Sequence, residues 1–173
     1  RGLGDVYKRQ DEYIIRNQSN ILISSNISLF ADMLKCTRDI KSCIEFGANI
    51  GLNLIAIRSL LPMIEQCAIE INSNAANKLK EILPSEAVYN ESILNFLPKR
   101  TWDLVLIKGV LIHQLPDSLP EVYKTLVDST GRYLFICEYY NPTPTMVNYR
   151  GHEDRLFKRD FAGEIMERHP QMN

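Results

Sequence analysis

The 173-residue sequence contains no apolar run long enough to cross a membrane. Its longest apolar stretch, 104–115, is interrupted by Lys108 and falls short of the roughly 18 apolar residues that a membrane helix needs. A formal net charge of -1 also leaves the chain without the broad basic surface of a nucleic-acid binder. These two absences predict a protein with neither a membrane partner nor a nucleic-acid partner.

Cysteine is sparse too, with four residues and none of the Cys-x-x-Cys spacing that zinc sites use. Each of the four lies in or beside an apolar segment: Cys36, Cys43, Cys67 and Cys137. We therefore expect reduced thiols packed in the core of a cytoplasmic protein, and no metal site.

No repeat, low-complexity tract or interdomain linker divides the chain, and 45% of its residues are hydrophobic. This composition is typical of one globular domain. Residues 1–10, RGLGDVYKRQ, contain two glycines but lack the strand and the apolar helix that flank a nucleotide loop. They resemble the translated end of a transposase adapter from sequencing libraries, so the domain is assigned to 11–173 and 1–10 is excluded as an artefact.

Strand-like and helix-like segments alternate along the chain. Short runs rich in β-branched, aromatic and other apolar residues predict strands at 42–46, 66–71, 87–90, 103–107 and 132–139. Apolar residues at helical spacing predict helices at 25–36, 52–61, 74–83 and 118–130, the first capped by Ser25 or Asn26. Such alternation is typical of an α/β fold with a mostly parallel, doubly wound, Rossmann-like sheet, which binds ligands beyond the carboxyl ends of its strands.

The first predicted strand runs into a glycine turn, in the segment CIEFGANIG. Gly47 and Gly51 would let the backbone approach a ligand closely, and Asn49 is among the few other residues that tolerate a positive φ. Glu70 ends the second strand, where an acid can accept hydrogen bonds from both hydroxyls of a ribose. A turn needed only for packing would explain the glycines but not the acid, so the pair favours a cofactor that contains a ribose.

The spacing of the turn separates two classes of cofactor site. The dinucleotide signature Gly-x-Gly-x-x-Gly does not fit GANIG. An acid two positions before the first glycine instead resembles motif I of class I S-adenosylmethionine methyltransferases, and this resemblance makes Glu45 the acid that places the methionyl end of the cofactor. The segment 90–93, NESI, resembles the stretch with which these enzymes contact adenine, although by itself it also fits an ordinary helix cap.

The resemblance to class I methyltransferases implies S-adenosyl-L-methionine as the cofactor. It also implies a set of cofactor-binding residues at or just after the ends of the first four predicted strands. These residues are Glu45, Gly47, Asn49, Gly51, Glu70, Ile71, Asn90, Glu91, Ser92, Ile93, Lys108 and Gly109.

Three further segments resemble one family. DLVLIKGVLIHQLPDSLPEVY, EYYNPTPTMVNYRGHEDRLFKRDFAGE and DEYIIRN are similar to the pseudaminic acid biosynthesis-associated methylases, a branch of the class I fold. The resemblance implies O-methyl transfer to a nonulosonic acid, free or nucleotide-activated, in surface or flagellar glycan synthesis. It also implies a fragment, since family members have residues before DEYIIRN and a final strand pair beyond this sequence. The uncovered sheet edge of such a fragment predicts poor solubility.

Methyl transfer requires an acceptor oxygen held in line with the methyl group and a base whose pKa lies near neutrality. His152, in the loop after the fifth strand, is the first candidate for this base, and His113, after the fourth strand, is the second. The alternatives are a histidine that bonds only within its loop and a histidine that packs in the core. The third histidine, His169, lies in a polar tail.

The acceptor is expected at the end of the fifth strand and in the segment after it. Tyrosines can stack on or bond to a sugar, and arginines can clasp its carboxylate. The predicted acceptor-binding residues are Glu138, Tyr139, Tyr140, Tyr149, Arg150 and Arg155. Plain packing of the tyrosines is an alternative, and the mixed charges of 150–168 also fit a solvated helix with internal ion pairs.

Three other functions are compatible with parts of this pattern. A nucleic-acid amino-methyltransferase is expected to carry Asp/Asn-Pro-Pro-Tyr after the fourth strand, where this chain has Ile107, Lys108, Gly109 and Val110. A class I methyltransferase for another small molecule would share the glycine turn. A non-catalytic domain could keep the fold as a binding scaffold, although the intact turn and Glu70 argue against lost cofactor binding.

Overall fold

The structure is a computed structural model that describes residues 20–149 and 152–172. It divides into two compact units, Arg1–Ile93 and Leu94–Asn173. The segments RGLGDVYKRQ and DEYIIRN lie outside the described residues, and so does Arg150. The assignment of 11–173 to one domain therefore stays a prediction.

The first unit contains three parallel strands in the order β3-β2-β1. They are β1 (Ser42–Phe46), β2 (Glu65–Ile69) and β3 (Val88–Tyr89), with Ser42 opposite Glu65 and Ala68 opposite Val88. The helices α3 (Leu52–Leu60) and α4 (Ser73–Leu79) follow β1 and β2, and the short helix η1 (Ser85–Ala87) precedes β3. The predicted strands and helices are confirmed here to within a few residues, because buried parallel strands read as continuous apolar runs.

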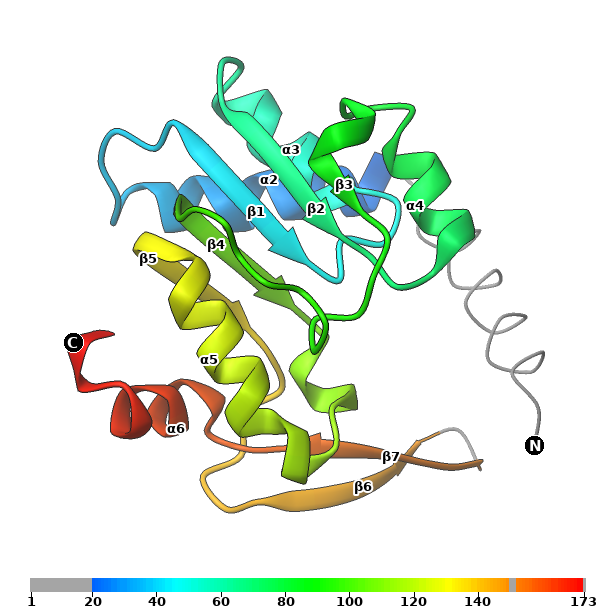
Figure 1. The fold of residues 1–173 in the computed structure, drawn as a ribbon, viewed down its shortest axis with the longest axis vertical. Helices are drawn as coiled ribbons and strands as arrows, with labels where there is room; N and C mark the ends of the chain where they lie inside the picture. The colour runs from blue at the N-terminus through cyan, green and yellow to red at the C-terminus, as the bar shows by residue number, and fades with distance from the viewer. Residues whose placement is uncertain (1–19, 150–151, 173) are drawn as a thin grey trace. The chain divides into compact units, whose positions relative to one another are not determined.

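A longer helix, α2 (Asn20–Leu34), precedes β1 and packs against α3 on one face of the strands (Figure 1). The prediction of a helix was right, but the cap at Ser25 or Asn26 was wrong because both residues lie inside the helix. Asn26 is buried one turn before the fully buried Phe30, so both lie on one face of the helix. This face packs into the interior of the unit.

The second unit begins with the parallel pair β4 (Trp102–Lys108) and β5 (Thr130–Cys137), in which Lys108 lies opposite Cys137. Two short 3-10 helices, η2 (Leu111–His113) and η3 (Pro116–Ser118), and the helix α5 (Leu119–Ser129) connect the two strands. The helix α5 packs on both strands and buries an apolar face. Both predicted strands and the predicted helix are confirmed.

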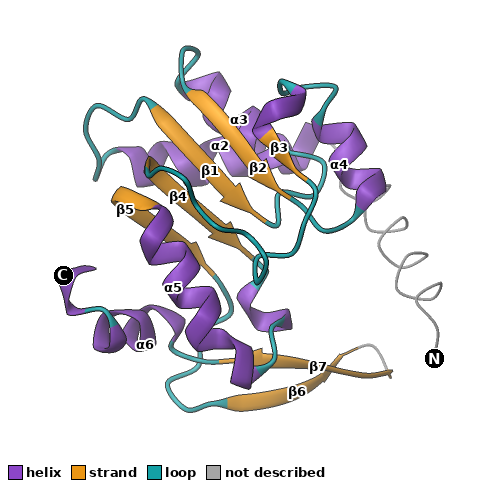
Figure 2. Ribbon diagram, in the orientation of Figure 1, coloured by secondary structure: helices purple, strands orange, loops and turns teal. Residues whose placement is uncertain are grey.

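An antiparallel hairpin follows β5 and is coloured as strand in Figure 2. It consists of β6 (Thr145–Tyr149) and β7 (His152–Lys158), and α6 (Phe161–Arg168) and η4 (Pro170–Met172) come after it. The alternative of a helix over 150–168 was wrong in its first half. HEDRLFK pairs with TMVNY, a segment that contains the β-branched residues Thr145 and Val147. This pairing stabilises a strand although the local sequence also fits a helix.

Cys43 and Cys67 are buried, whereas Cys36 is exposed, so the prediction of core packing was wrong for Cys36. In the part of the chain that the structure describes, no helix has both the length and the apolar character to span a bilayer. The order of strands and helices in the two units confirms an α/β fold with Rossmann-like alternation.

Candidate functional site

The glycine turn after β1 adopts a left-handed backbone at three positions. The φ angles are 72° at Gly47, 50° at Asn49 and 82° at Gly51. The Gly47 amide donates to the Ile69 carbonyl oxygen at 2.9 Å, which ties the turn to the end of β2. A Cβ at Gly51 would lie 2.5 Å from Cδ1 of Ile82, so the positive φ favours glycine there and a larger residue would have to displace the Ile82 side chain.

Glu70 closes this turn from the carboxyl end of β2. Its Oε2 accepts a hydrogen bond from the Asn49 amide, and its Oε1 accepts one from the Asn72 amide, each at 2.8 Å. Only 7% of Glu70 is exposed, and this burial raises the pKa of its carboxyl group although the backbone N–H donors oppose the rise. Each carboxylate oxygen keeps a second lone pair that could accept a further donor such as a ribose hydroxyl.

Glu45 lies on β1, two positions before the turn, and is 1% exposed. The side-chain amide of Asn53, in the first turn of α3, donates to its Oε1 at 2.5 Å. Glu45 is thereby held beside the start of α3. The first unit therefore brings the predicted acid of β1, the turn and the acid of β2 to one end of its strands.

Asn90, directly after β3, bonds to the protein with its whole side chain. Its Nδ2 donates to the carbonyl oxygens of Glu70 at 2.8 Å and Ile71 at 3.2 Å, and its Oδ1 accepts from the Ser73 hydroxyl at 3.0 Å. No helix begins at 90–93 among the described residues, so the alternative of a helix cap was wrong. The geometry makes Asn90 a residue that positions the turn between β2 and α4.

The remaining predicted residues of this segment differ in exposure. Glu91 and Ser92 are partly buried, and Ile93 is buried. Ile71, next to Glu70, is 61% exposed and presents apolar surface beside the acid. A flat apolar group such as a purine could cover this side chain.

In the second unit, β4 ends with Lys108, and Gly109 follows it with a φ of 68°. Glu138 comes directly after β5, and its Oε1 accepts hydrogen bonds from the amides of Val110 at 2.7 Å and Leu111 at 2.9 Å. Burial raises the pKa of the Glu138 carboxyl group, against the opposing effect of these backbone donors. Glu138 therefore fixes the chain where β4 runs into η2.

The two tyrosines after Glu138 are exposed: Tyr139 by 62% and Tyr140 by 64%. The Lys158 ammonium lies 5.3 Å from the ring centroid of Tyr139, within the range of a cation–π contact. Exposure at this level argues against plain packing of the pair. His113, at the end of η2, is also exposed, which argues against the alternative of a packed histidine.

The remaining predicted site residues belong to the hairpin of β6 and β7 and to the segment between its strands. Tyr149 pairs with His152 at the end of the hairpin, and Arg155 pairs with Asn148. The side chains of Tyr149, His152 and Arg155 lie outside the described part of the structure, as does all of Arg150. Their predicted functions stay untested.

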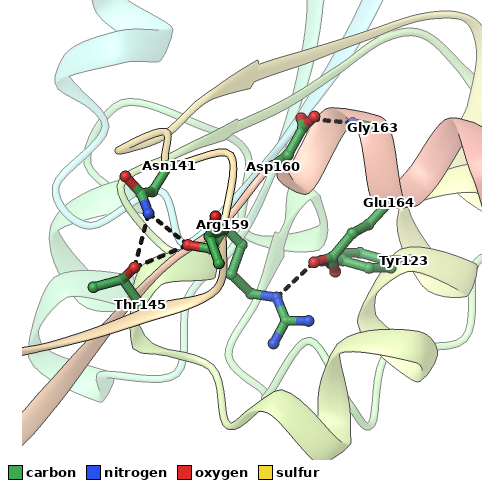
Figure 3. A network of polar contacts seen from close by, with 8 residues as sticks. Tyr123, Asn141, Thr145, Arg159, Asp160, Gly163 and Glu164 are labelled. Atoms are coloured by element: carbon green, nitrogen blue, oxygen red, sulfur yellow. Dashed lines mark hydrogen bonds and ion pairs between the residues drawn. The ribbon is translucent and has the colours of Figure 1, made fainter.

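A polar network that the sequence did not predict joins the base of the hairpin to two helices (Figure 3). Glu164 on α6 accepts from Nε of Arg159 at 2.6 Å and from the hydroxyl of Tyr123 on α5 at 2.8 Å. The backbone amide of Asn141 donates to the Arg159 carbonyl oxygen at 3.3 Å. Burial and the bond to Glu164 raise the pKa of the Tyr123 hydroxyl. The opposite charges of Arg159 and Glu164 could have indicated their ion pair from the sequence. The sequence carried no signal that Tyr123, on α5, would bond to Glu164.

Within the described ranges, no three His, Cys, Asp or Glu side chains gather as a metal site would require. The chain matches no protein-family model and no curated protein.

Solved methyltransferase structures do resemble the chain. The glycopeptide N-methyltransferase MtfA has a TM-score of 0.66 at 13% identity, with 83% of each chain covered. The fold is that of class I methyltransferases. The sugar N-methyltransferase KedS8 from Streptoalloteichus sp ATCC 53650 has a TM-score of 0.60 at 14% identity, covering 87% of this chain and 62% of that one.

A third similar structure is the plantazolicin methyltransferase BpumL in complex with SAH. Its TM-score is 0.61 at 15% identity, and the match covers 77% of this chain. The chain spans 53% of the length of BpumL. At these identities the likeness establishes the fold and leaves activity and substrate to the residues themselves.

Proposed function

We propose that this protein is an S-adenosylmethionine-dependent methyltransferase. The observation that carries the proposal is the left-handed turn of Gly47, Asn49 and Gly51, joined through the Asn49 amide to the buried acid Glu70. A backbone turn of this kind, closed by an acid on the next parallel strand, suits a ligand with a ribose. The methyltransferase fold, seen with SAH in BpumL, makes an adenosyl sulfonium cofactor the best candidate.

The residues present fit such a cofactor. The two Glu70 oxygens could each accept one ribose hydroxyl while they keep their backbone bonds. The exposed Ile71 could pack on adenine, with Glu91, Ser92 and Ile93 beside it, and Glu45 could hold the ammonium of the methionyl end. Lys108 and Gly109, in the second unit, remain predicted cofactor-binding residues on the basis of the sequence. When bound, the cofactor supplies an electrophilic methyl group.

Calorimetry with S-adenosylhomocysteine tests this proposal. Glu70→Ala removes a charged acceptor, and hydrogen bonds to charged groups contribute about 1.5 to 3 kcal/mol, so affinity should fall at least about tenfold. The matched control is Glu65→Ala, an exposed acid at the opposite end of β2, which should bind as the wild type does. Equal affinity of folded Glu70→Ala and wild type would refute the assignment.

For the acceptor we propose an anionic nine-carbon sugar of the nonulosonic acid type, free or nucleotide-activated, methylated on a hydroxyl. The support is the sequence resemblance of the EYYNPTP to FAGE block, together with exposed Tyr139 and Tyr140 at the end of β5. Aromatic surface of this kind binds sugars well. Arg150 and Arg155 are the residues proposed to meet the carboxylate, and the reaction is proposed to take place in the cytoplasm.

A panel of acceptors tests this substrate class. The protein is incubated with labelled S-adenosylmethionine and, separately, pseudaminic acid, its CMP derivative, a neutral hexose and a short peptide. Transfer to either nonulosonic acid supports the proposal. Transfer only to the hexose or the peptide would refute this acceptor while leaving the methyltransferase proposal intact.

A further inference from the structure

The contact between Lys158 and Tyr139 lies at the surface of the second unit and joins two segments that are far apart in the sequence. Lys158 ends β7, and Tyr139 comes two positions after β5. The ammonium nitrogen lies 5.3 Å from the centroid of the tyrosine ring. Tyr139 is 62% exposed, whereas Trp102, over which Arg100 lies in a similar contact, is 2% exposed. The Tyr139 ring therefore has free surface for a ligand, which the Trp102 ring lacks.

The positive charge of Lys158 has no carboxylate partner among the described residues. The two acids that follow it are engaged elsewhere, since Asp160 accepts from the Gly163 amide and Glu164 pairs with Arg159. Lys158 is also half-buried, and a cation that has lost part of its hydration attracts an anion more strongly than a fully exposed cation does. A ligand with a negative charge would supply the partner.

Both side chains of this contact extend from backbone that is held in place. Lys158 pairs with Thr145 in the hairpin, and the residues next to the contact, Tyr140 and Arg159, form a parallel bridge. The side-chain amide of Asn141 donates to the Thr145 hydroxyl at 2.7 Å, which holds the segment between β5 and β6 (Figure 3). A ligand that binds here does not have to order this backbone first, and such preorganisation favours affinity.

We propose that Tyr139 and Lys158 form the site that selects an acidic sugar as the methyl acceptor. The tyrosine ring packs on the sugar ring, and the lysine ammonium donates a hydrogen bond to the sugar carboxylate. The inference rests on the proposed function, because it names residues that bind the proposed acceptor. All the contacts that carry it lie in the second unit. The ring contributes affinity for sugars in general, and the ammonium contributes the preference for an acid.

The first test is an NMR titration of the full chain, without cofactor, with pseudaminic acid and with its methyl ester. Lys158→Met removes the charge and keeps a long apolar side chain. Its affinity for the acid should fall about tenfold, as for the loss of a hydrogen bond between charged groups, while its affinity for the ester should equal that of the wild type. Tyr139→Ala should weaken binding of the acid and of the ester by the same factor.

Two further variants complete this test. Lys158→Arg keeps a cation that also contacts aromatic rings, so it should recover most of the affinity for the acid. The matched control is Lys124→Met, an exposed lysine of α5, which should bind both ligands as the wild type does. The proposal is overturned if Lys158→Met binds the acid as tightly as the wild type, or if it loses affinity for acid and ester equally. A wild-type protein that does not prefer the acid to its ester would also overturn it.

The second test uses the wild-type protein alone and therefore does not depend on how the variants fold. Both ligands should shift the ring resonances of Tyr139, but the acid should shift the resonances of the Lys158 ε-methylene group more than the ester does. Side-chain resonances of Tyr139 and Lys158 that stay unchanged when the acid is added would overturn the proposal. Binding of S-adenosylhomocysteine is measured separately. Its absence would overturn the proposed methyltransferase, whereas its presence without a response to the acid would overturn only this site.

Discussion

The two units each place a glutamate directly after a parallel strand, yet the two side chains are used differently. Glu70 follows β2 and bonds a backbone amide with each of its oxygens. Glu138 follows β5 and places both backbone bonds on one oxygen. The first acid uses both oxygens to hold a turn, whereas the second holds a turn with one oxygen alone. The same position after a parallel strand thus anchors the following backbone through two carboxylate oxygens in one unit and through one in the other.

The glycines of the two turns provide the largest expected contrast. Gly51→Ala combines a positive φ with a clash against Ile82 and Leu79, so the free energy of unfolding should fall by about 3 kcal/mol. Gly109→Ala carries the positive φ but meets open space, and the loss should be about 1 kcal/mol. Denaturant unfolding of both variants measures the difference. Equal losses would mean that packing does not distinguish the two turns.

Replacing each acid by its amide sharpens the comparison. Glu70→Gln puts an NH₂ group against the amide of Asn49 or Asn72, and an unsatisfied buried donor should lower the free energy of unfolding by about 1 to 3 kcal/mol. In Glu138→Gln the amide oxygen can keep both backbone bonds, and the NH₂ group replaces an oxygen that already lacks a partner among the described residues, so the loss should be smaller than in Glu70→Gln. Chemical denaturation tests this order, and a larger loss in Glu138→Gln would contradict the hydrogen-bond pattern.

The network at the base of the hairpin should contribute less. Tyr123→Phe removes the hydroxyl that donates to Glu164 while Arg159 keeps its bond, so the free energy of unfolding should fall by about 1 kcal/mol. Tyr133→Phe is the matched control, because among the described residues the Tyr133 hydroxyl has one hydrogen bond, a long and exposed one from Arg132 at 3.5 Å. Thermal unfolding of both variants measures the effect. Identical melting temperatures would show that the network does not stabilise the fold.

The smallest effect concerns pH. The folded-state pKa of Glu138 is raised, so its contribution to stability is fully present below the pKa of the unfolded chain and is lost as pH rises through the folded value. Glu138→Gln lacks this titration. The variant should therefore gain stability relative to the wild type as pH rises from about 4 to neutrality. Melting temperatures measured across this range test the sign, and a gap that narrows with rising pH would contradict it.

Much of the architecture could be read from the order of residues. The strands β1, β2 and β4 are apolar runs of the kind that buried parallel strands require, and the helices between them show helical spacing of apolar residues. The left-handed turn could be anticipated because only glycine and a few polar residues adopt positive φ readily. The hairpin at Thr145–Lys158 was missed, since its mixed charges are equally compatible with a helix until the pairing partner is known.

The local sequence determines the alternation of strands and helices, the glycine turn at 47–51 and the candidate acids at the strand ends. It can do so because backbone preference and burial act over a few neighbouring residues. The local sequence does not determine which carboxylate oxygen bonds to which backbone amide. Glu70 bonds to an amide 21 positions away in the chain, and Glu138 bonds to one 28 positions away. The same holds for the side chain of Asn90, a predicted cofactor-binding residue, whose amide donates to the carbonyl oxygens of Glu70 and Ile71. Such partners meet only after strands far apart in the chain have aligned, so the tertiary fold alone selects them.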